Sequence, residues 1–102
     1  MSYRLAFGPK AQEAYDGLPF SLLDAFDTEM DRLAADPSAV SVPGAFPFLA
    51  DRMVYHFSVE DHEGGRWHFA AHFRYATDEQ TLNVIAVTVL PPTPLPPDLS
   101  GA

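Results

Sequence analysis

The chain has 102 residues, a formal net charge of −8 and no cysteine, and 47% of its residues are hydrophobic. A chain of this size buries roughly 60 to 65% of its unfolded surface, which predicts a single globular domain. Without cysteine there can be no disulfide framework, thiolate metal site or cysteine nucleophile, and the negative charge disfavours a general nucleic-acid coat.

The N-terminus predicts a strand followed by a short helix. Residues 3–7 alternate between apolar and other side chains up to a Gly-Pro pair, which is typical of a strand that ends in a turn. Pro9 suits the first turn of a helix, and apolar residues then recur at helical spacing. We expect this helix to end at residues 17–19, Gly-Leu-Pro.

A second helix is predicted from Ser21 to Ala35. Ser21 and Asp24 resemble a capping box, and an apolar stripe accompanies them at helical spacing. The stripe comprises Phe20, Leu23, Phe26, Met30 and Leu33. Residues 37–50 contain three prolines and one glycine, so we expect a connection without regular structure.

The second half of the chain predicts three strands. Residues 52–59 and 66–75 alternate in polarity, and residues 81–90 form an apolar run that is typical of an interior strand. Together the elements predict an α+β domain over residues 1–90, with two N-terminal helices packed on one face of a four-stranded, mostly antiparallel sheet. Residues 91–102 begin with five prolines among seven residues, and we expect an extended, disordered tail.

Alternation along the two middle strands divides their side chains between two faces of the sheet. The odd-numbered residues are mostly apolar and are expected to pack on the helices. The even-numbered residues, on the other face, include Arg52, Val54, His56, Ser58, Arg66, His68, His72 and Arg74. In the last strand, a three-residue turn at 78–80 directs Ile85, Val87 and Val89 to the helices and Val84, Ala86 and Thr88 beneath the histidines.

Histidines and an arginine on one face are residue types that metal-free RNA cleavage can use. One imidazole can take the proton of the 2′-hydroxyl, another can protonate the leaving 5′-oxygen, and an arginine can stabilise the charge on the phosphate. His68 and His72 lie about 13 Å apart along one strand, so the pair needs His56 from the neighbouring strand. The candidate catalytic residues are His56, His68, His72 and Arg74, and the candidate binding residues are Arg52, Ser58 and Arg66.

Two registers between the middle strands remain open. If the numbers of paired residues sum to 128, His56 lies opposite His72, with about 5 Å between the Cβ atoms. If they sum to 126, His56 lies diagonal to both other histidines at about 7 to 8 Å. The second register also forms the pairs Glu60–Arg66 and Ser58–His68.

The histidine-bearing stretches 52–58 and 67–74 contain no acid that could complete a metal site, so we expect neither a metal nor a cofactor. A competing interpretation remains for the histidines themselves. They are also compatible with a partly solvated sheet face that has no chemistry, or with a surface that binds a partner.

Four stretches resemble the RelE/ParE toxin superfamily. They are FGPKAQEAYDGLP at residues 7–19, DRLAADP at 31–37, MVYHFSV at 53–59 and WHFAAHFRYATDEQTLNVIAV at 67–87. The resemblance covers residues 3–90 and rests on the order of the elements and on weak local similarity. It implies the fold of that superfamily and a growth-inhibiting role in a bacterial toxin–antitoxin pair. In the superfamily, the ribonuclease members cut messenger RNA at the ribosome, whereas the ParE branch acts on DNA gyrase.

The resemblance also maps ribonuclease positions onto this chain. The basic sites of the second strand fall near His56 and Ser58, and the arginine of the third strand falls near His68. Arg66 and Arg74 flank that position. The basic or tyrosine residue at the end of the fourth strand falls at Leu-Pro-Pro, residues 90–92, which are neither basic nor phenolic. If the protein is an enzyme, the resemblance implies a metal-independent endoribonuclease.

The resemblance implies an antitoxin or another protein as the partner, and the sequence is also compatible with a homodimer. RNA is disfavoured by the net charge, although residues 52–75 hold three arginines against three acids together with all four histidines. The alternative to a toxin is a catalytically inert, toxin-like scaffold that acts as a protein-interaction module. No apolar run is long enough for a secretory signal or a membrane span, so we expect a soluble protein of the cytoplasm.

Overall fold

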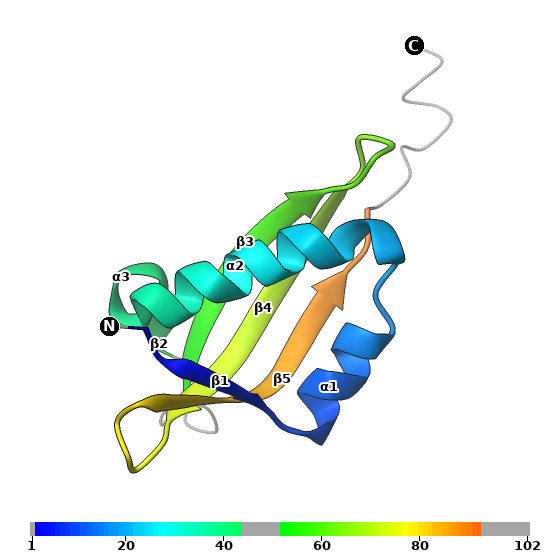
Figure 1. Ribbon diagram of the computed structural model, residues 1–102. Coiled ribbons are helices and arrows are strands. Elements are labelled where there is room, and N and C mark those ends of the chain that lie inside the picture. The colour runs from blue at the N-terminus through cyan, green and yellow to red at the C-terminus, as the bar shows by residue number, and fades with distance from the viewer. Residues whose placement is uncertain (1, 44–51, 93–102) are drawn as a thin grey trace.

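A computed structural model describes residues 2–43 and 52–92 of the chain. Within these residues the strands are β1 (Arg4–Phe7), β2 (Val42–Pro43), β3 (Met53–Glu60), β4 (Arg66–Tyr75) and β5 (Thr81–Leu90). The helices are α1 (Pro9–Asp16), the 3-10 turn η1 (Phe20–Leu22), α2 (Leu23–Ala35) and the one-turn helix α3 (Pro37–Val40). Helices α1 and α2 cover one face of a sheet with the strand order β1-β5-β4-β3-β2 (Figure 1).

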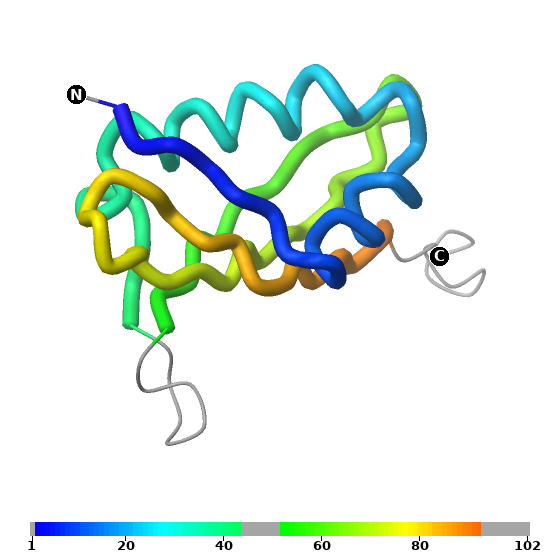
Figure 2. The backbone as a smooth tube through the Cα atoms, turned by 60° about the horizontal axis from the view of Figure 1, so that its bottom comes forward, coloured from blue at the N-terminus to red at the C-terminus, as the bar shows by residue number. Residues whose placement is uncertain are grey.

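The predicted α+β architecture is confirmed, and the sheet gains a short fifth strand, β2, within the described residues. Strand β1 pairs in parallel with β5, and all other neighbours are antiparallel. The last strand, β5, therefore lies beside the first strand, β1, although both helices and the strands β2, β3 and β4 come between them in the sequence. This topology makes β1 one edge of the sheet, and in Figure 2 it runs between α2 and β5.

The start of α2 differs from the predicted capping box. The chain first makes η1, which contains Ser21, and no side chain caps the first amides of α2. A 3-10 turn has three residues per turn, so it shifts the direction of the side chains that precede the helix. As a result Leu22 is fully buried, whereas Phe20, which the sequence placed in the apolar stripe, is 90% exposed.

The connection predicted at residues 37–50 contains two short regular elements, which corrects that prediction. Pro37 begins α3, because a proline is tolerated in the first turn of a helix, and the hydroxyl of Ser41 donates to the Pro37 carbonyl. The next residues form β2, where Val42 pairs with Val54 of β3. Residues 44–51 lie outside the described part of the chain.

The register between β3 and β4 is the one in which paired residue numbers sum to 126. His56 pairs with Ala70, and the alternative register is excluded. The two pairs that accompany this register are formed, namely Ser58–His68 and Glu60–Arg66. Because the pairing is continuous from Met53 to Glu60, the two strands keep their even-numbered side chains on the same face.

Strand β5 contains a bulge that corrects the predicted faces of two residues. The register shifts between His72 and Phe73 of β4, and Ile85 is the extra residue on β5. A bulge interrupts the alternation of side chains, so the residues before it take the opposite side from the one predicted. Val84 is consequently fully buried opposite Phe73, in the place expected for Ile85, while Val87 packs against the core as predicted.

The core lies between the two helices and the odd-numbered side chains of β3 and β4. Phe26 of α2 is at its centre, with ring centroids 5.4 Å from Tyr15, 5.7 Å from Phe57 and 5.6 Å from Phe69. The largest fully buried side chains are Phe26, Phe73, Leu22, Leu33, Leu82 and Val84. Burying each such side chain contributes about 1.5 to 3 kcal/mol, so this layer fixes which side of the sheet faces the helices.

Strand β5 ends at Leu90, and Pro91 and Pro92 follow it. Most of the tail predicted at residues 91–102 falls outside the described part of the chain, which ends at Pro92. In the described ranges, none of the helices combines the length and the apolar character that crossing a bilayer requires.

Candidate functional site

The side of the sheet that faces away from α1 and α2 carries three of the four histidines, and we term it the histidine face. His56 and His68 are exposed there, and His72 is half-buried. Between them in sequence, the odd-numbered residues such as Phe57 and Phe69 pack in the core on the other side. The structure therefore places these three histidines on the same face.

His56 occupies the middle of this group. It pairs with Ala70, so His68 and His72 are its two diagonal neighbours on β4. Diagonal neighbours on adjacent strands lie about 7 to 8 Å apart, which allows two imidazoles to reach one group placed between them. His68 and His72 are four residues apart on the same strand, so they cannot form such a pair with each other.

A hollow of about 260 Å³ opens on the histidine face. It is lined by His56 of β3, by His68, Phe69 and Ala70 of β4, and by Thr88 and Leu90 of β5. Neither Asp nor Glu is among these residues, and across residues 2–43 and 52–92 no group of three His, Asp or Glu side chains is placed to hold a metal. The hollow is thus lined by two imidazoles and one hydroxyl, and no carboxylate lines it.

His72 is not part of this hollow, although its side chain is connected to it. Its Nε2 lies 3.3 Å from the Thr88 hydroxyl oxygen, and its Nδ1 is buried without a hydrogen-bond partner. Burial, followed by the charges of Arg52 and His56, lowers the pKa of His72. A neutral imidazole that holds the Thr88 hydroxyl is the state that this environment favours.

Strand β2 extends the sheet beside β3, level with His72. Val54, which pairs with His72, also pairs with Val42 of β2 and is only 5% exposed. Strand β2 ends beside this pair and does not extend to His56. Among the described residues, the sheet is therefore one strand wider at the level of His72 than at the level of the hollow.

The arginines of the histidine face occupy three different environments. Arg66 donates from Nη1 to the Ser58 hydroxyl at 3.3 Å and lies 3.8 Å from Glu60, in an exposed ion pair. Because Ser58 pairs with His68, this guanidinium is the one nearest to the hollow. Arg52 lies near His72, and its Nε is buried without a partner. Arg74 is exposed, two residues beyond His72, and does not line the hollow.

The two sides of the sheet differ in charge. Helices α1 and α2 carry six acids, Glu13, Asp16, Asp24, Asp27, Glu29 and Asp31, against Lys10 and Arg32. On the histidine face, Arg52, Arg66 and Arg74 accompany the three imidazoles. Half of the twelve acids of the described residues therefore stand on the two helices.

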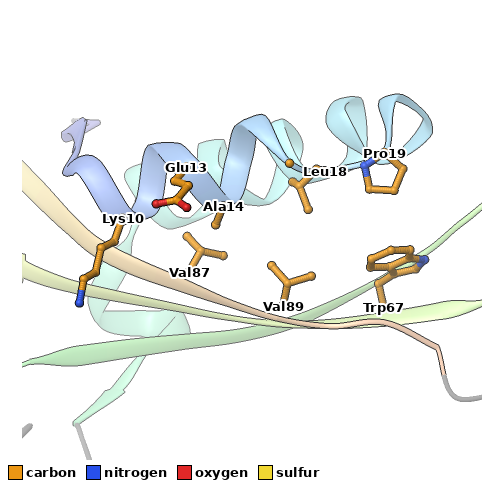
Figure 3. A pocket seen from close by; sticks show the side chains of 9 residues that line it. Lys10, Glu13, Ala14, Leu18, Pro19, Trp67, Val87 and Val89 are labelled. Carbon is orange, nitrogen blue, oxygen red and sulfur yellow. The ribbon is translucent and has the colours of Figure 1, made fainter.

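A second hollow, of about 520 Å³, lies on the helical side between α1 and β5 (Figure 3). Val87 and Val89 form its floor, and Trp67 and Pro19 close one end. Trp67 donates from Nε1 to the Asp61 carboxylate at 3.0 Å, which fixes its ring. The surface is mostly apolar, contains no histidine and has Lys10 and Glu13 as its charged groups.

Thr88 and Leu90 line the hollow, but sequence reasoning did not select them as site residues. Thr88 was expected only as part of the floor beneath the histidines. The available signal was a hydroxyl in the apolar second half of β5, opposite the small residue Ala70. The small side chain of Ala70 leaves room for the hollow. Ala70 lies opposite Thr88 only in the observed register of β4 against β5.

No protein-family model matches the chain, and neither does any curated protein sequence. Solved structures do match its fold. A chain of the toxin–antitoxin complex RelBE2 from Mycobacterium tuberculosis matches with a TM-score of 0.64 and 20% identity, over 85% of this chain and 96% of that chain. The E. coli toxin RelE, an arginine-to-alanine mutant in the free state, matches with a TM-score of 0.58 and 17% identity, over 85% and 82% of the two chains. A chain of the intact E. coli RelBE complex gives 0.57 and 16%, over 84% and 94%. The protein therefore has a RelE-like toxin fold.

Proposed function

We propose that the protein is a growth-inhibiting toxin that cleaves RNA at its histidine face and that an antitoxin holds inactive. The fold supports the toxin role, because it is shared with RelE and with chains of toxin–antitoxin complexes. The observation that carries the chemistry is the hollow in which His56 and His68 meet without a carboxylate. The protein would act in the cytoplasm, where RNA is available.

Two imidazoles can supply both the base and the acid, so the reaction needs no metal. One of His56 and His68 takes the proton of a 2′-hydroxyl, and the 2′-oxygen attacks the adjacent phosphorus. The other gives its proton to the leaving 5′-oxygen. The products are a 2′,3′-cyclic phosphate and a free 5′-hydroxyl. Arg66, which donates to Ser58 opposite His68, would stabilise the charge that develops on the phosphate oxygens.

His72 takes a positioning role in this proposal. Its lowered pKa keeps the imidazole neutral near pH 7, and its Nε2 fixes the Thr88 hydroxyl that lines the hollow. Arg52 and Arg74, farther along the same face, would bind phosphates that flank the cleaved one. The proposed catalytic residues are thus two, His56 and His68, instead of the four that the sequence suggests.

The uneven distribution of charge weakens the argument that the negative net charge disfavours RNA binding. Six of the acids stand on α1 and α2, on the far side of the sheet from the hollow. At physiological salt, exposed charges separated by more than about 8 Å are largely screened from each other. RNA at the histidine face would therefore respond mainly to the charges of that face, namely Arg52, Arg66, Arg74 and the Glu60 carboxylate that pairs with Arg66, rather than to the net charge.

Induced expression in a bacterial host tests the toxin role. We expect the wild type to stop growth and the double variant His56→Ala/His68→Ala to grow normally at the same protein level. His62→Ala is the matched control, because His62 is an exposed histidine in the turn between β3 and β4. Normal growth with abundant wild-type protein would remove the toxin proposal.

Cleavage by the purified protein tests the chemistry. In the presence of a metal chelator, the wild type should produce RNA fragments that end in a 2′,3′-cyclic phosphate. Replacing either His56 or His68 by alanine should lower the rate by about 100-fold to 10,000-fold, the range typical of a general acid or base. A rate that depends on added metal, or that both variants keep, would contradict the mechanism.

A second function is favoured by the end of β5. Residues 90–92, Leu-Pro-Pro, carry no basic or phenolic side chain, where the resemblance implies one for ribonuclease members. The protein would then be a toxin-like scaffold that binds a protein partner without cleavage. Stable binding to a protein encoded by a neighbouring gene, together with unaffected growth and intact RNA, would support this alternative.

A further inference from the structure

Ala70 lies in the middle of the hollow on the histidine face, with a polar side chain on each side. His56 of β3 pairs with Ala70, and Ala70 pairs in turn with Thr88 of β5. The Cβ atoms of paired residues on neighbouring strands lie about 4.5 to 5.5 Å apart. A small group that rests on the Ala70 methyl therefore lies within reach of the His56 imidazole and of the Thr88 hydroxyl. His68, two residues before Ala70, lines the same hollow.

The Thr88 hydroxyl has one hydrogen-bond partner in residues 2–43 and 52–92 of the chain. That partner is Nε2 of His72, which lies 3.3 Å from the hydroxyl oxygen. A hydroxyl donates one hydrogen and accepts two. The direction of the bond to His72 therefore decides what Thr88 offers to a ligand in the hollow.

The environment of the His72 ring favours one direction. A neutral imidazole carries its hydrogen on one nitrogen only. Nδ1 of His72 is buried without a partner, and a buried N–H without an acceptor is rare in folded proteins. Arg52, whose charge acts on this imidazole, offers donors but no acceptor. The hydrogen is therefore assigned to Nε2, which donates to the Thr88 oxygen, so the hydrogen of the Thr88 hydroxyl remains free to donate.

We propose that Thr88 contacts the substrate, and that its hydroxyl, held by His72, donates to a non-bridging oxygen of a phosphate group that rests over Ala70. The inference rests on the proposed function for its substrate, an RNA phosphodiester, and adds a position for the phosphate and a further contact to it. The protons of His56 and His68 move between the 2′-oxygen and the 5′-oxygen in that mechanism. Thr88 instead supplies a fixed, uncharged donor to an oxygen that gains charge in the transition state.

A phosphate suits this place better than a nucleobase. Phe69 lines the hollow, but it is 3% exposed and its ring stacks on Phe57 in the core, with 5.0 Å between the centroids. The lining contains neither Asn nor Gln, the side chains that commonly read the edge of a base. Two imidazoles line the hollow, and Arg66 lies beside it, so the charges that are present favour an anion.

Binding of uridine 3′-phosphate to the full-length protein tests the contact without cleavage. In NMR spectra, the methyl signals of Ala70 and Thr88 should shift in a saturable way. Thr88→Val has the same shape and suits a strand, and it should weaken binding by about threefold to tenfold, the value of one hydrogen bond. Thr88→Ser, which keeps the hydroxyl, should recover most of that loss. Equal affinity of the wild type and Thr88→Val would overturn the proposal.

Thr28→Val is the matched control for Thr88→Val. The Thr28 hydroxyl donates to the Asp24 carbonyl within α2, on the other side of the sheet. This variant should bind uridine 3′-phosphate as the wild type does. A loss equal to that of Thr88→Val would show that the effect is not local to the hollow and would overturn the proposal.

Two further substitutions test the position of the phosphate and the role of His72. Ala70→Val fills the space over residue 70 without removing a polar group, and it should weaken binding by at least about tenfold. His72→Phe should weaken binding as Thr88→Val does, and the two changes together should be no worse than Thr88→Val alone. Unchanged binding by Ala70→Val would overturn the position of the phosphate. Additive losses would show that His72 does not act through Thr88 and would overturn its part in the proposal.

Cleavage of phosphorothioate RNA tests the same contact during the reaction. Sulfur is a weak hydrogen-bond acceptor, so the wild type should cut one of the two diastereomers at the cleaved linkage more slowly. That difference should shrink in Thr88→Val, and kcat should fall by about 100-fold, and by more than KM changes, which is the lower limit when a donor to a developing oxyanion is removed. Cleavage that Thr88→Val leaves intact would refute this inference alone. Nucleotide binding that depends on Thr88 without any cleavage would refute the proposed function alone.

Discussion

Phe20 and Phe26 are six residues apart, one outside the core and one at its centre. They allow a direct test of which residues belong to the core. Phe26 is fully buried, with three aromatic rings between 5.4 and 5.7 Å from its own. Phe20 is 90% exposed, because η1 turns it away from the stripe to which its spacing assigns it. The same substitution at the two positions should therefore have very different effects on stability.

The magnitude follows from burial. Phe26→Ala removes a fully buried ring and leaves a cavity, which typically costs about 3 to 5 kcal/mol of the free energy of unfolding. Domains of this size have about 5 to 15 kcal/mol in total, so the variant could be partly unfolded. Phe26→Leu, which retains more of the volume, should cost roughly half as much. Phe20→Ala should change stability by less than about 0.5 kcal/mol.

Urea unfolding measures these differences. The chain has a single tryptophan, Trp67, which is half-buried and reports the loss of tertiary structure. With a slope of about 1 to 3 kcal/mol per molar urea, a loss of 3 kcal/mol lowers the midpoint by about 1 to 3 M. If Phe20→Ala shifted the midpoint as far as Phe26→Leu, the assignment of η1 and of the core would be refuted.

Two further predictions concern titratable groups. The folded-state pKa of His72 lies below its ordinary value of 6.5, so the folded protein binds fewer protons than the unfolded chain and should lose stability as the pH falls through 6.5. His72→Gln should flatten this decline in urea midpoints measured from pH 7.5 to 5, and a slope equal to that of the wild type would contradict the prediction. Burial, and then its hydrogen bond to Glu29, raises the pKa of Tyr55 to about 12. Tyr55→Phe should therefore remove the last tyrosine to ionise in an absorbance titration and should lower stability by about 1 to 2 kcal/mol. A titration curve unchanged at its alkaline end would disprove the Tyr55 assignment.

The long strands β4 and β5 have the bounds that the sequence predicts, residues 66–75 and 81–90. Both are defined by local signals, namely the period of the side chains and the polar turns beside them. Apolar side chains recur at every second residue of β4, so several positions support the assignment of this segment as a strand. Local periodicity therefore explains the success for these elements.

Two of the errors, the bulge in β5 and the unpredicted strand β2, arose where the structure depends on contacts between distant residues. The bulge at Ile85 allows Val84 and Leu82 to face the core beside β1, a strand more than 70 residues away in sequence. Strand β2 has only two residues and exists because it pairs with β3. Neither feature has a local period, so neither could be predicted from alternation alone.

The candidate site was predictable only in part for the same reason. The alternation of side chains along the strands predicts that His56, His68 and His72 lie on one face, and in the structure they do. Which two histidines share the hollow depends on the register of β3 against β4 and on Thr88 of β5. These are relations between strands, and the sequence left two registers open.

The separation of charge follows from the architecture of the sheet. A sheet buried on one side by helices can carry unlike surfaces, because the helical side and the open side are formed by different elements. In this chain six of the twelve acids of the described residues stand on α1 and α2, and the two arginines of β4, Arg66 and Arg74, are directed to the open side, with Arg52 adjoining them. An anionic substrate that binds the open side would therefore meet these arginines on a surface that the sheet separates from the acids of the helices.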